Sequence, residues 1–402
     1  MIIRRFLTWI EAAPADQRAD AANALARAYL ESELTPEDRE IADAALTLLL
    51  DDPSPDVRLG LARAVGPAPN APHHIIVALA EDRADIAALV LAQSPLILDI
   101  EAIDWLGRGE PLIERAIASR RTISTELCDA LCAAAGERAI VTLLENPGVT
   151  YTAKGLLALS RRLGRVAAIR TMLLDIKTLP TEAREVLLHH HAEQLGALVL
   201  ERGWLGSDAV SRITSEAVEK GTTTLVSWAQ EDELDSLIDH LMQEQRLTAA
   251  FMLRSLCSGN IDLFERTMAR LVGVDQRRMR SIVRSGNLSA FSAAYTKSSL
   301  PNEAFDVFAA ALSVTCQWHT SPHITEVRQL PRRIMEEILA RCGGAPEGAS
   351  INSSMRLLRR LAADAARDSA RNFAQAVAKA DVSAGQNGLR GQADQVQIAN
   401  AA

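Results

Sequence analysis

Three consecutive histidines, His189, His190 and His191, are the residues best suited to hold a transition metal, since neutral imidazole is a common metal ligand. On a helix, however, adjacent side chains point about 100° apart, whereas ligands on one helix face stand three or four residues apart. Glu193 adds a carboxylate without a recognised metal-binding spacing. We therefore interpret the segment as a solvated helix near a turn, and we expect no metal and no other cofactor.

A second histidine pair, His319 and His323, flanks a Thr-Ser-Pro segment, with Trp318 and Glu326 close by. These side chains could line a polar pocket for a small ligand or an enzyme substrate. Pro322 ends a helix, however, so a spacing of four no longer places both imidazoles on one face. An enzyme or small-ligand module stays open as an alternative, without catalytic residues assigned to it.

The five cysteines are an odd number and scattered, which fits a reducing compartment. Cys128 and Cys132 lie one turn apart on a helix expected from Ser124, and without a second Cys or His pair we interpret them as small core residues. Cys257 and Cys316 fall in apolar helices, which predicts burial and low reactivity. The sequence contains no glycine-rich phosphate loop, nucleophile elbow or His-Glu-x-x-His motif, so we do not expect an enzyme.

Arginines gather in two segments at spacings of three, four and seven, which place several on one helix face. The candidate binding residues are Arg277, Arg278, Arg280, Arg284, Arg356, Arg359 and Arg360. Such a surface could hold DNA phosphates, but Asp364 and Asp368 interleave with the second cluster and only 4% of residues are aromatic. We therefore expect a basic helix that docks onto an acidic partner or onto the chain's own acidic N-terminal half, with nucleic acid as an alternative.

The net charge of −8 hides an asymmetry. Residues 246–402 carry 20 Lys+Arg against 13 Asp+Glu, whereas residues 1–245 carry 23 against 38. Hydrophobic residues make up 48% of the 402 residues, mostly Ala and Leu, which favours helix. No apolar run approaches the roughly 20 residues of a membrane-spanning helix, and the short apolar stretch after Arg5 does not resemble a secretory signal, so we expect a cytoplasmic protein without a membrane span.

Helices of 10 to 15 residues, separated by short breaks, are predicted from Asp16 onward. The clearest start is at Thr35, which can cap a helix whose first residue is Pro36 and which runs to about Leu50. The segment Asp51–Gly66 then resembles the turn and second helix of a HEAT repeat, a repeated pair of antiparallel helices. Small residues such as Gly60 are expected to let neighbouring helices approach closely.

A weaker copy follows 29 residues later, with Asp85-Ile86 aligned on Asp56-Val57, and a third candidate turn lies at Glu145–Val149. A period of 30 to 40 residues predicts stacked helix pairs. Further helices are expected at about 181–200, 207–219, 231–245, 248–257, 261–271, 275–285, 288–296 and 302–315. The predicted parts are 1–230, HEAT-like repeats; 231–322, degenerate repeats; 323–381, basic C-terminal helices; and 382–402, a disordered tail.

Two blocks together resemble the bacterial domain-of-unknown-function 2336 family of HEAT-like proteins. They are the HEAT-like start and the later segment Leu247–Glu265, followed by Leu271–Val274 and Tyr295–Pro301, so the resemblance covers roughly residues 20–315. The family implies the fold and brings no activity or cofactor. We predict an all-α, HEAT-like α-solenoid of stacked antiparallel helix pairs with a C-terminal helical extension, which acts as a non-catalytic scaffold or adaptor for an unidentified protein partner.

Overall fold

The computed structural model describes residue 9, residues 13–320 without the side chains of 318–320, and residues 335–340, 356–367, 369–371 and 374. Every regular element among them is a helix, apart from an isolated parallel bridge between Ile123 and Val149. The all-α prediction is therefore confirmed. None of the helices within these residues is both long enough and apolar enough to cross a membrane.

The chain divides into two compact units, Met1–Ala197 and Leu198–Ala402. The four-part division made from the sequence stays a prediction, and its tail at 382–402 lies outside the described residues.

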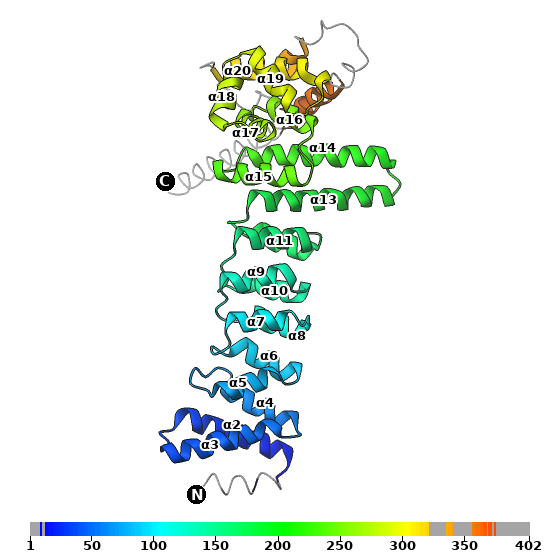
Figure 1. Cartoon of the computed structure of the whole chain (residues 1–402). Helices are drawn as coiled ribbons and strands as arrows, with labels where there is room; N and C mark the ends of the chain where they lie inside the picture. Colours follow the sequence, from blue (N-terminus) through cyan, green and yellow to red (C-terminus); the bar gives the residue numbers. More distant parts are fainter. Residues whose placement is uncertain are drawn as a thin grey trace, which may run out of the picture. The chain divides into compact units, whose positions relative to one another are not determined.

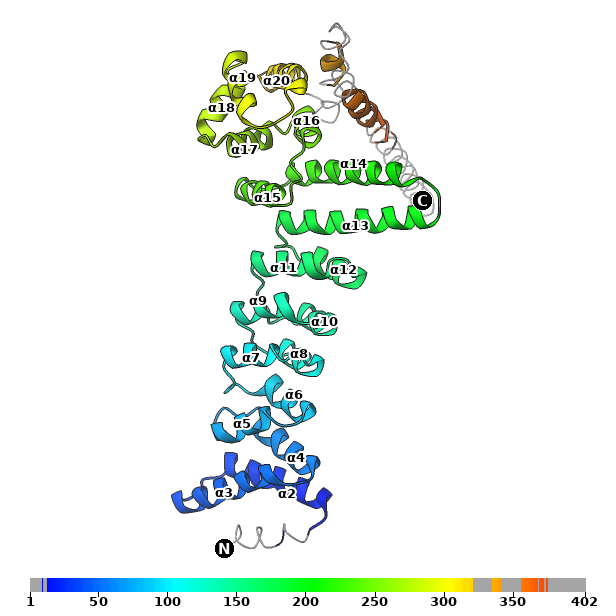
Figure 2. The same ribbon diagram turned by 45° about the vertical axis from the view of Figure 1, so that its right-hand side comes forward.

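In unit 1, α-helices alternate with short turns and lie in successive layers (Figures 1 and 2). They are α2 Ala15–Glu31, α3 Pro36–Leu48, α4 Pro55–Val65, α5 His73–Ala80, α6 Ala84–Gln93, α7 Asp99–Leu106, α8 Pro111–Ala118, α9 Thr125–Ala134, α10 Glu137–Glu145, α11 Ala153–Leu163, α12 Ala167–Asp175 and most of α13 Thr181–Glu201, with a 3-10 turn, η1, at Leu49–Asp51. α2, α4, α6, α8, α10 and α12 pack each on the next of this series, and α7, α9 and α11 form a second series. Each layer thus covers the apolar face of the one before it.

Local signals set where these helices begin. The Thr35 hydroxyl accepts the backbone N–H of Asp38 at 3.2 Å, and Pro36 occupies the first turn, as predicted. Ser124 and Thr152 cap α9 and α11 in the same way, by accepting the N–H groups of Leu127 and Gly155. These caps satisfy donors that the first turn of a helix leaves unpaired.

The two predicted repeat copies occupy equivalent places in their helices. Val57 in α4 and Ile86 in α6 are both fully buried, each one residue after the acid of the first turn. Gly60 lies where α4 crosses α2, and a Cβ atom there would stand 2.6 Å from the carbonyl oxygen of Ala19. The close approach expected at Gly60 is therefore present, since any larger residue would force the two helices apart.

Arginine side chains tie successive layers together. Arg18 binds both carboxylate oxygens of Asp52 at 2.8 and 2.9 Å, and Arg58 binds Asp82 in the next turn through Nε and Nη2. Further along, the buried Arg120 donates to the carbonyl oxygens of Leu91 and Ile97, each at 2.9 Å. The bonds of Arg120 satisfy backbone carbonyl groups, and those of Arg18 and Arg58 are charge-assisted bonds to carboxylates.

The helices of unit 2 pack around an aromatic core. They are α14 Ser207–Val226, α15 Glu231–Gln243, α16 Ala249–Cys257, α17 Ile261–Val272, α18 Gln276–Arg284, α19 Leu288–Lys297 and α20 Phe305–Thr320, with a 3-10 turn, η2, at Asn302–Ala304. Phe264, Phe291, Tyr295, Phe305 and Phe308 meet with neighbouring ring centroids 5.4 to 6.3 Å apart. This packing is the edge-to-face and offset geometry that aromatic rings prefer, and it holds α17, α19 and α20 together.

α14 continues to Val226, whereas the sequence predicted an end at Glu219. The extension contains Gly221 and three threonines, which are poor helix formers. Thr222 and Val226 are buried, however, and the Thr222 hydroxyl donates to the carbonyl oxygen of Val218 at 2.9 Å. Packing of this last turn outweighs the weak local propensity, which explains the error.

Candidate functional site

The arginine-rich helix α18 begins with a side-chain cap. Oδ1 of Asp275 accepts the backbone N–H groups of Arg277 at 2.8 Å and Arg278 at 3.4 Å. The N–H groups of this first turn, which in an uncapped helix can bind an anion, therefore already have an acceptor.

Arg280 and Arg284 point to a buried carboxylate on α17. The side chain of Glu265 is 1% exposed and accepts Nε–H of Arg284 at 2.6 Å and Nε–H of Arg280 at 3.2 Å. Asp262 adds a second acceptor for Arg284 at 2.7 Å. The hydrogen bond to Glu265 raises the pKa of Arg284, against a smaller opposing effect of burial. Two of the predicted binding arginines thus neutralise a buried acid of their own chain.

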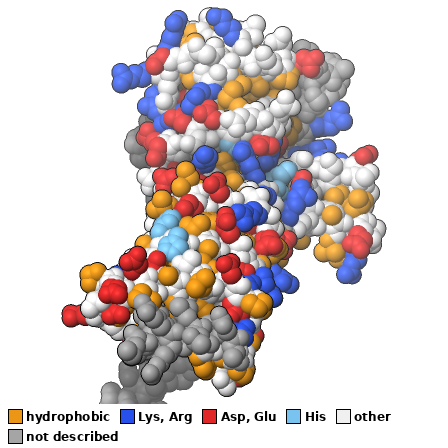
Figure 3. Space-filling view, turned by 60° about the horizontal axis from the view of Figure 1, so that its bottom comes forward, with side chains coloured by type: hydrophobic (Ala, Val, Ile, Leu, Met, Phe, Trp, Pro, Cys, Tyr) orange, Lys and Arg blue, Asp and Glu red, His pale blue; other side chains and the backbone are white. Residues whose placement is uncertain are grey.

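Arg277 and Arg278 differ from these two. Both are exposed, and neither side chain forms an ion pair with any residue in the described part of the chain. On the face of the molecule in Figure 3, Lys and Arg side chains lie among Asp and Glu side chains and do not form one continuous basic field. On α18, Arg277 and Arg278 carry the charge that is left for a partner, because Arg280 and Arg284 are paired with carboxylates.

The second predicted cluster lies on the described helical residues 356–367. Leu358 and Leu361 are buried in the same apolar cluster as α16 to α20, so this helix packs on the rest of unit 2. Arg360 lies 3.5 Å from Glu216 of α14, while Arg356 and Arg359 are exposed. Part of this cluster is therefore directed at the chain's own acidic residues.

A buried arginine holds that helix to α14 and α16. The Arg254 guanidinium lies 3.6 Å from Glu219 and 3.9 Å from Asp364, with its side chain 8% exposed. Burial raises the pKa of Glu219, although the charge of Arg254 opposes the shift. Asp364, which the sequence suggested only as a charge between arginines, thus has a structural partner.

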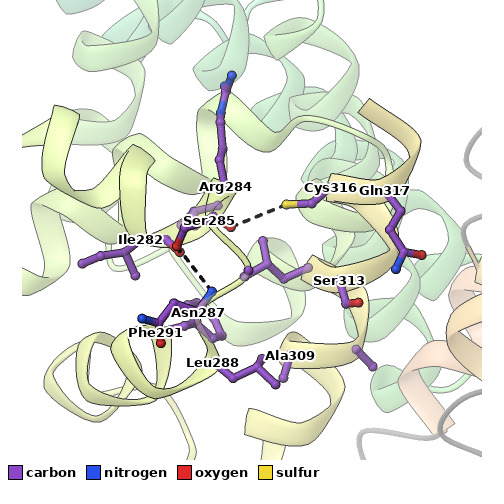
Figure 4. A pocket seen from close by; sticks show the side chains of 14 residues that line it. Ile282, Arg284, Ser285, Asn287, Leu288, Phe291, Ala309, Ser313, Cys316 and Gln317 are labelled. Carbon is purple, nitrogen blue, oxygen red and sulfur yellow. Dashed lines mark hydrogen bonds between the residues drawn. The ribbon is translucent and has the colours of Figure 1, made fainter. Parts of the chain in front are cut away.

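A pocket of about 460 Å³ lies next to α18, between its last turn, α19 and α20 (Figure 4). Apolar lining comes mainly from Ile282, Leu288, Phe291 and Ala309, and Leu288 is 55% exposed at the rim. This volume falls in the range of roughly 300–1,000 Å³ that is usual for ligand sites.

The turn between α18 and α19, residues 285–287, lines one side of the pocket. Gly286 has a φ of 67°, a left-handed conformation that glycine adopts without a steric penalty. The N–H of Asn287 donates to Ser285 Oγ at 3.3 Å, and its side chain caps α19 by accepting the N–H groups of Ser289 and Ala290. The pocket rim is therefore held by local hydrogen bonds.

The polar groups of the pocket do not form a catalytic arrangement. Ser285, Ser313 and Cys316 could act as nucleophiles, yet no histidine, aspartate, glutamate or lysine is among the described residues that line the pocket. The Cys316 thiol donates to the carbonyl oxygen of Val283 at 3.5 Å, and burial raises its pKa. The thiol is therefore neutral near pH 7, and these groups can orient a ligand by hydrogen bonding.

The histidine segment lies on α13. His189 Nε2 is 3.2 Å from Glu193 Oε1, and burial lowers the pKa of His190. Within the described residues no three His, Cys, Asp or Glu side chains are placed to hold a metal ion. The side chain of His319 and all of His323 lie outside the described residues, so the second histidine prediction is not tested.

The four cysteines among the described residues fall into two groups. Cys128, Cys132 and Cys257 are buried and reduced. The hydrogen bond with Cys128, together with burial, raises the pKa of Cys132, which fits a core residue. Cys316 is only half-buried and lines the pocket, so the burial predicted for it was overestimated.

Sequence reasoning missed both Glu265 and the pocket. Asp262 and Glu265 stand three residues apart, opposite the Arg280 and Arg284 pair that is four apart, and this complementary spacing was a usable signal. The pocket has no comparable signal, because the Ser-Gly-Asn break at 285–287 reads as an ordinary turn.

The family model described as "uncharacterised protein conserved in bacteria" (DUF2336) matches residues 86–346, more than half of the chain. The match confirms the family resemblance. It begins after the HEAT-like segment Asp51–Gly66 and contains all of α18, α19 and α20. No curated protein and no solved structure matches the chain.

Proposed function

Because this chain belongs to the bacterial DUF2336 family, whose members are uncharacterised, we propose from its geometry that it is a non-catalytic protein-binding adaptor. Its pocket between α18, α19 and α20 takes an apolar side chain of the partner. The observation that carries this proposal is an apolar pocket with an exposed leucine at its rim and no base among its described lining residues.

The exposed rim favours a macromolecular partner over a small ligand. Leu288 would stay largely in water above a ligand confined to the pocket. A protein segment can fill the pocket and cover this leucine at the same time. Burying one large apolar side chain contributes roughly 1.5–3 kcal/mol, so an anchor in the pocket plus the covered leucine contributes about 3–6 kcal/mol to the complex.

We propose further that unit 1 is a HEAT-like α-solenoid. The two series of helices, each packed on the next of its kind, and the layer-to-layer bonds of Arg18, Arg58 and Arg120 support this architecture. Solenoids present extended surfaces that commonly hold proteins. The proposed compartment is the cytoplasm, because the scattered cysteines suit a reducing environment.

Nucleic-acid binding is less well supported. Phosphate binding needs several unpaired cations along one surface. Arg280, Arg284 and Arg360 are already paired with carboxylates of this chain.

The test is a selection of random 12-residue peptides displayed on phage against the full-length protein, followed by measurement of Kd for synthetic hits by fluorescence anisotropy. Ala309→Phe fills the pocket, and Ala293→Phe places the same bulk on an exposed position of α19 outside it. We expect at least a 10-fold weaker Kd for Ala309→Phe and an unchanged Kd for Ala293→Phe. Equal binding by all three proteins would contradict the proposal, provided that circular dichroism shows the same helix content in each.

A further inference from the structure

Resting on the proposed function, we infer that the partner segment is acidic: an apolar side chain enters the pocket while carboxylates next to it bind Arg277 and Arg278. The geometry that points to this partner is the position of two arginines on the helix that forms one wall of the pocket, neither of which has a carboxylate partner among the described residues.

Arg278 and the pocket share a face of α18. Arg278 precedes Ile282 by four residues and Ser285 by seven, and both of these line the pocket. At about 1.5 Å per residue, Arg278 stands roughly 6 Å along the helix axis from Ile282. A partner segment of two helical turns, about 11 Å long, therefore reaches from the pocket to the arginine.

The arginines near the pocket differ in how much of their charge is already neutralised by carboxylates of this chain. Arg284 at the pocket itself is bound by Glu265 and Asp262, so it offers little charge to a partner. Arg277 and Arg278 are adjacent like charges, and the carboxylate of Asp275 is directed at their backbone N–H groups. A partner carboxylate relieves this repulsion, and such pairs at the edge of an interface act mainly on the association rate.

The same site discriminates against a phosphate group. Asp275 already occupies the N–H groups at the start of α18 and adds a negative charge there. A free phosphate also gains nothing from the apolar pocket. An acidic peptide with an aliphatic or aromatic anchor uses both features at once.

The experiment uses the full-length protein and the peptides selected on it. The double variant Arg277→Glu/Arg278→Glu reverses the proposed charge, and Arg115→Glu/Arg212→Glu makes the same change in net charge at exposed arginines on other helices. We expect the selected peptides to be enriched in Asp and Glu. We expect Kd to rise about 10-fold for the first variant and to stay within twofold for the control, with the difference shrinking in high salt. A peptide whose acids are replaced by lysine should bind the Arg277→Glu/Arg278→Glu variant more tightly than wild type.

The outcomes separate this inference from the proposed function. One outcome is that the selected peptides bind Ala309→Phe more weakly than wild type, yet show no enrichment in acidic residues and no change of Kd on charge reversal. This result would overturn the inference of an acidic partner and leave the adaptor proposal standing. Peptides that bind Ala309→Phe as well as wild type, or a selection without enrichment, would overturn both. A labelled single-stranded oligonucleotide is the test for nucleic acid. If Arg277→Glu/Arg278→Glu weakens its binding while Ala309→Phe leaves its Kd unchanged, both the acidic-partner inference and the adaptor proposal are overturned in favour of nucleic-acid binding.

Discussion

Removing the carboxylate of Glu265 tests whether the arginines of α18 are structural or available for binding. Its side chain is 1% exposed and accepts two bonds from Arg284, at 2.6 Å from Nε and 3.2 Å from Nη2. Glu265→Ala removes these bonds and the one from Arg280. Arg284→Ala leaves the buried carboxylate with Arg280 alone, so both single variants should destabilise unit 2.

The size of the effect follows from the burial of each partner. Hydrogen bonds to a charged group contribute about 1.5–3 kcal/mol, and loss of one partner leaves the other desolvated. Arg284 is 47% exposed and can rehydrate, so we expect about 2 kcal/mol for Glu265→Ala. In a unit of this size, that loss lowers the melting temperature by about 4–8 °C.

Scanning calorimetry of wild type, Glu265→Ala, Arg284→Ala and the double variant measures the coupling of the two side chains. The double variant should melt close to the worse single variant, because both changes remove the same interaction. Arg277→Ala is the matched control and should change the free energy of unfolding by less than about 0.5 kcal/mol, since its side chain is exposed and unpaired among the described residues. Additive losses, or a loss for Arg277→Ala as large as that for Arg284→Ala, would refute the structural assignment.

Three further outcomes are expected. Gly60→Ala should destabilise unit 1 by about 1–3 kcal/mol in urea unfolding, because its Cβ would meet the Ala19 carbonyl oxygen at 2.6 Å; an unchanged midpoint would contradict the close helix contact. Burial tends to raise the pKa of Asp82, but the hydrogen bonds from Arg58 and from the backbone N–H of Arg83, together with the charges of these two arginines, outweigh burial and lower the pKa. The stabilisation by this carboxylate is therefore present above the unfolded pKa near 4 and is lost as pH falls through the folded value. The free energy of unfolding of Asp82→Asn should therefore differ from that of wild type at pH 7 and converge with it as the pH falls below the folded pKa of Asp82, and a constant difference would count against the ion pair. Alkylation of Cys316 at pH 7, followed by peptide mapping, should be slower than for a free cysteine peptide, because burial raises its pKa; equal rates would show an open thiol.

The starts of several helices in this chain depend on residues close in sequence, so they could be predicted from the sequence. Thr35 and Ser124 mark helix starts by their hydroxyl groups, and Pro36 fixes the first turn whatever the surroundings. The end of α14 was not predictable in this way, because Thr222 and Val226 remain helical through burial against residues distant in sequence.

The candidate site depends on contacts between helices, which one sequence does not reveal. The spacing of the arginines correctly indicated clusters on helix faces. It did not distinguish Arg284, bound to a carboxylate 19 residues earlier, from Arg278, which lacks a partner in the described part of the chain. The pocket likewise needs three helices to meet, and none of its residues is unusual in its own segment.

The most direct test of the adaptor proposal is hydrogen–deuterium exchange of the full-length protein with and without a saturating selected peptide. Binding in the pocket predicts slower amide exchange in segments 282–291 and 309–317, which contain its lining residues, and little change in α2 to α12. Protection confined to unit 1, with exchange at the pocket unaltered, would contradict the proposed site.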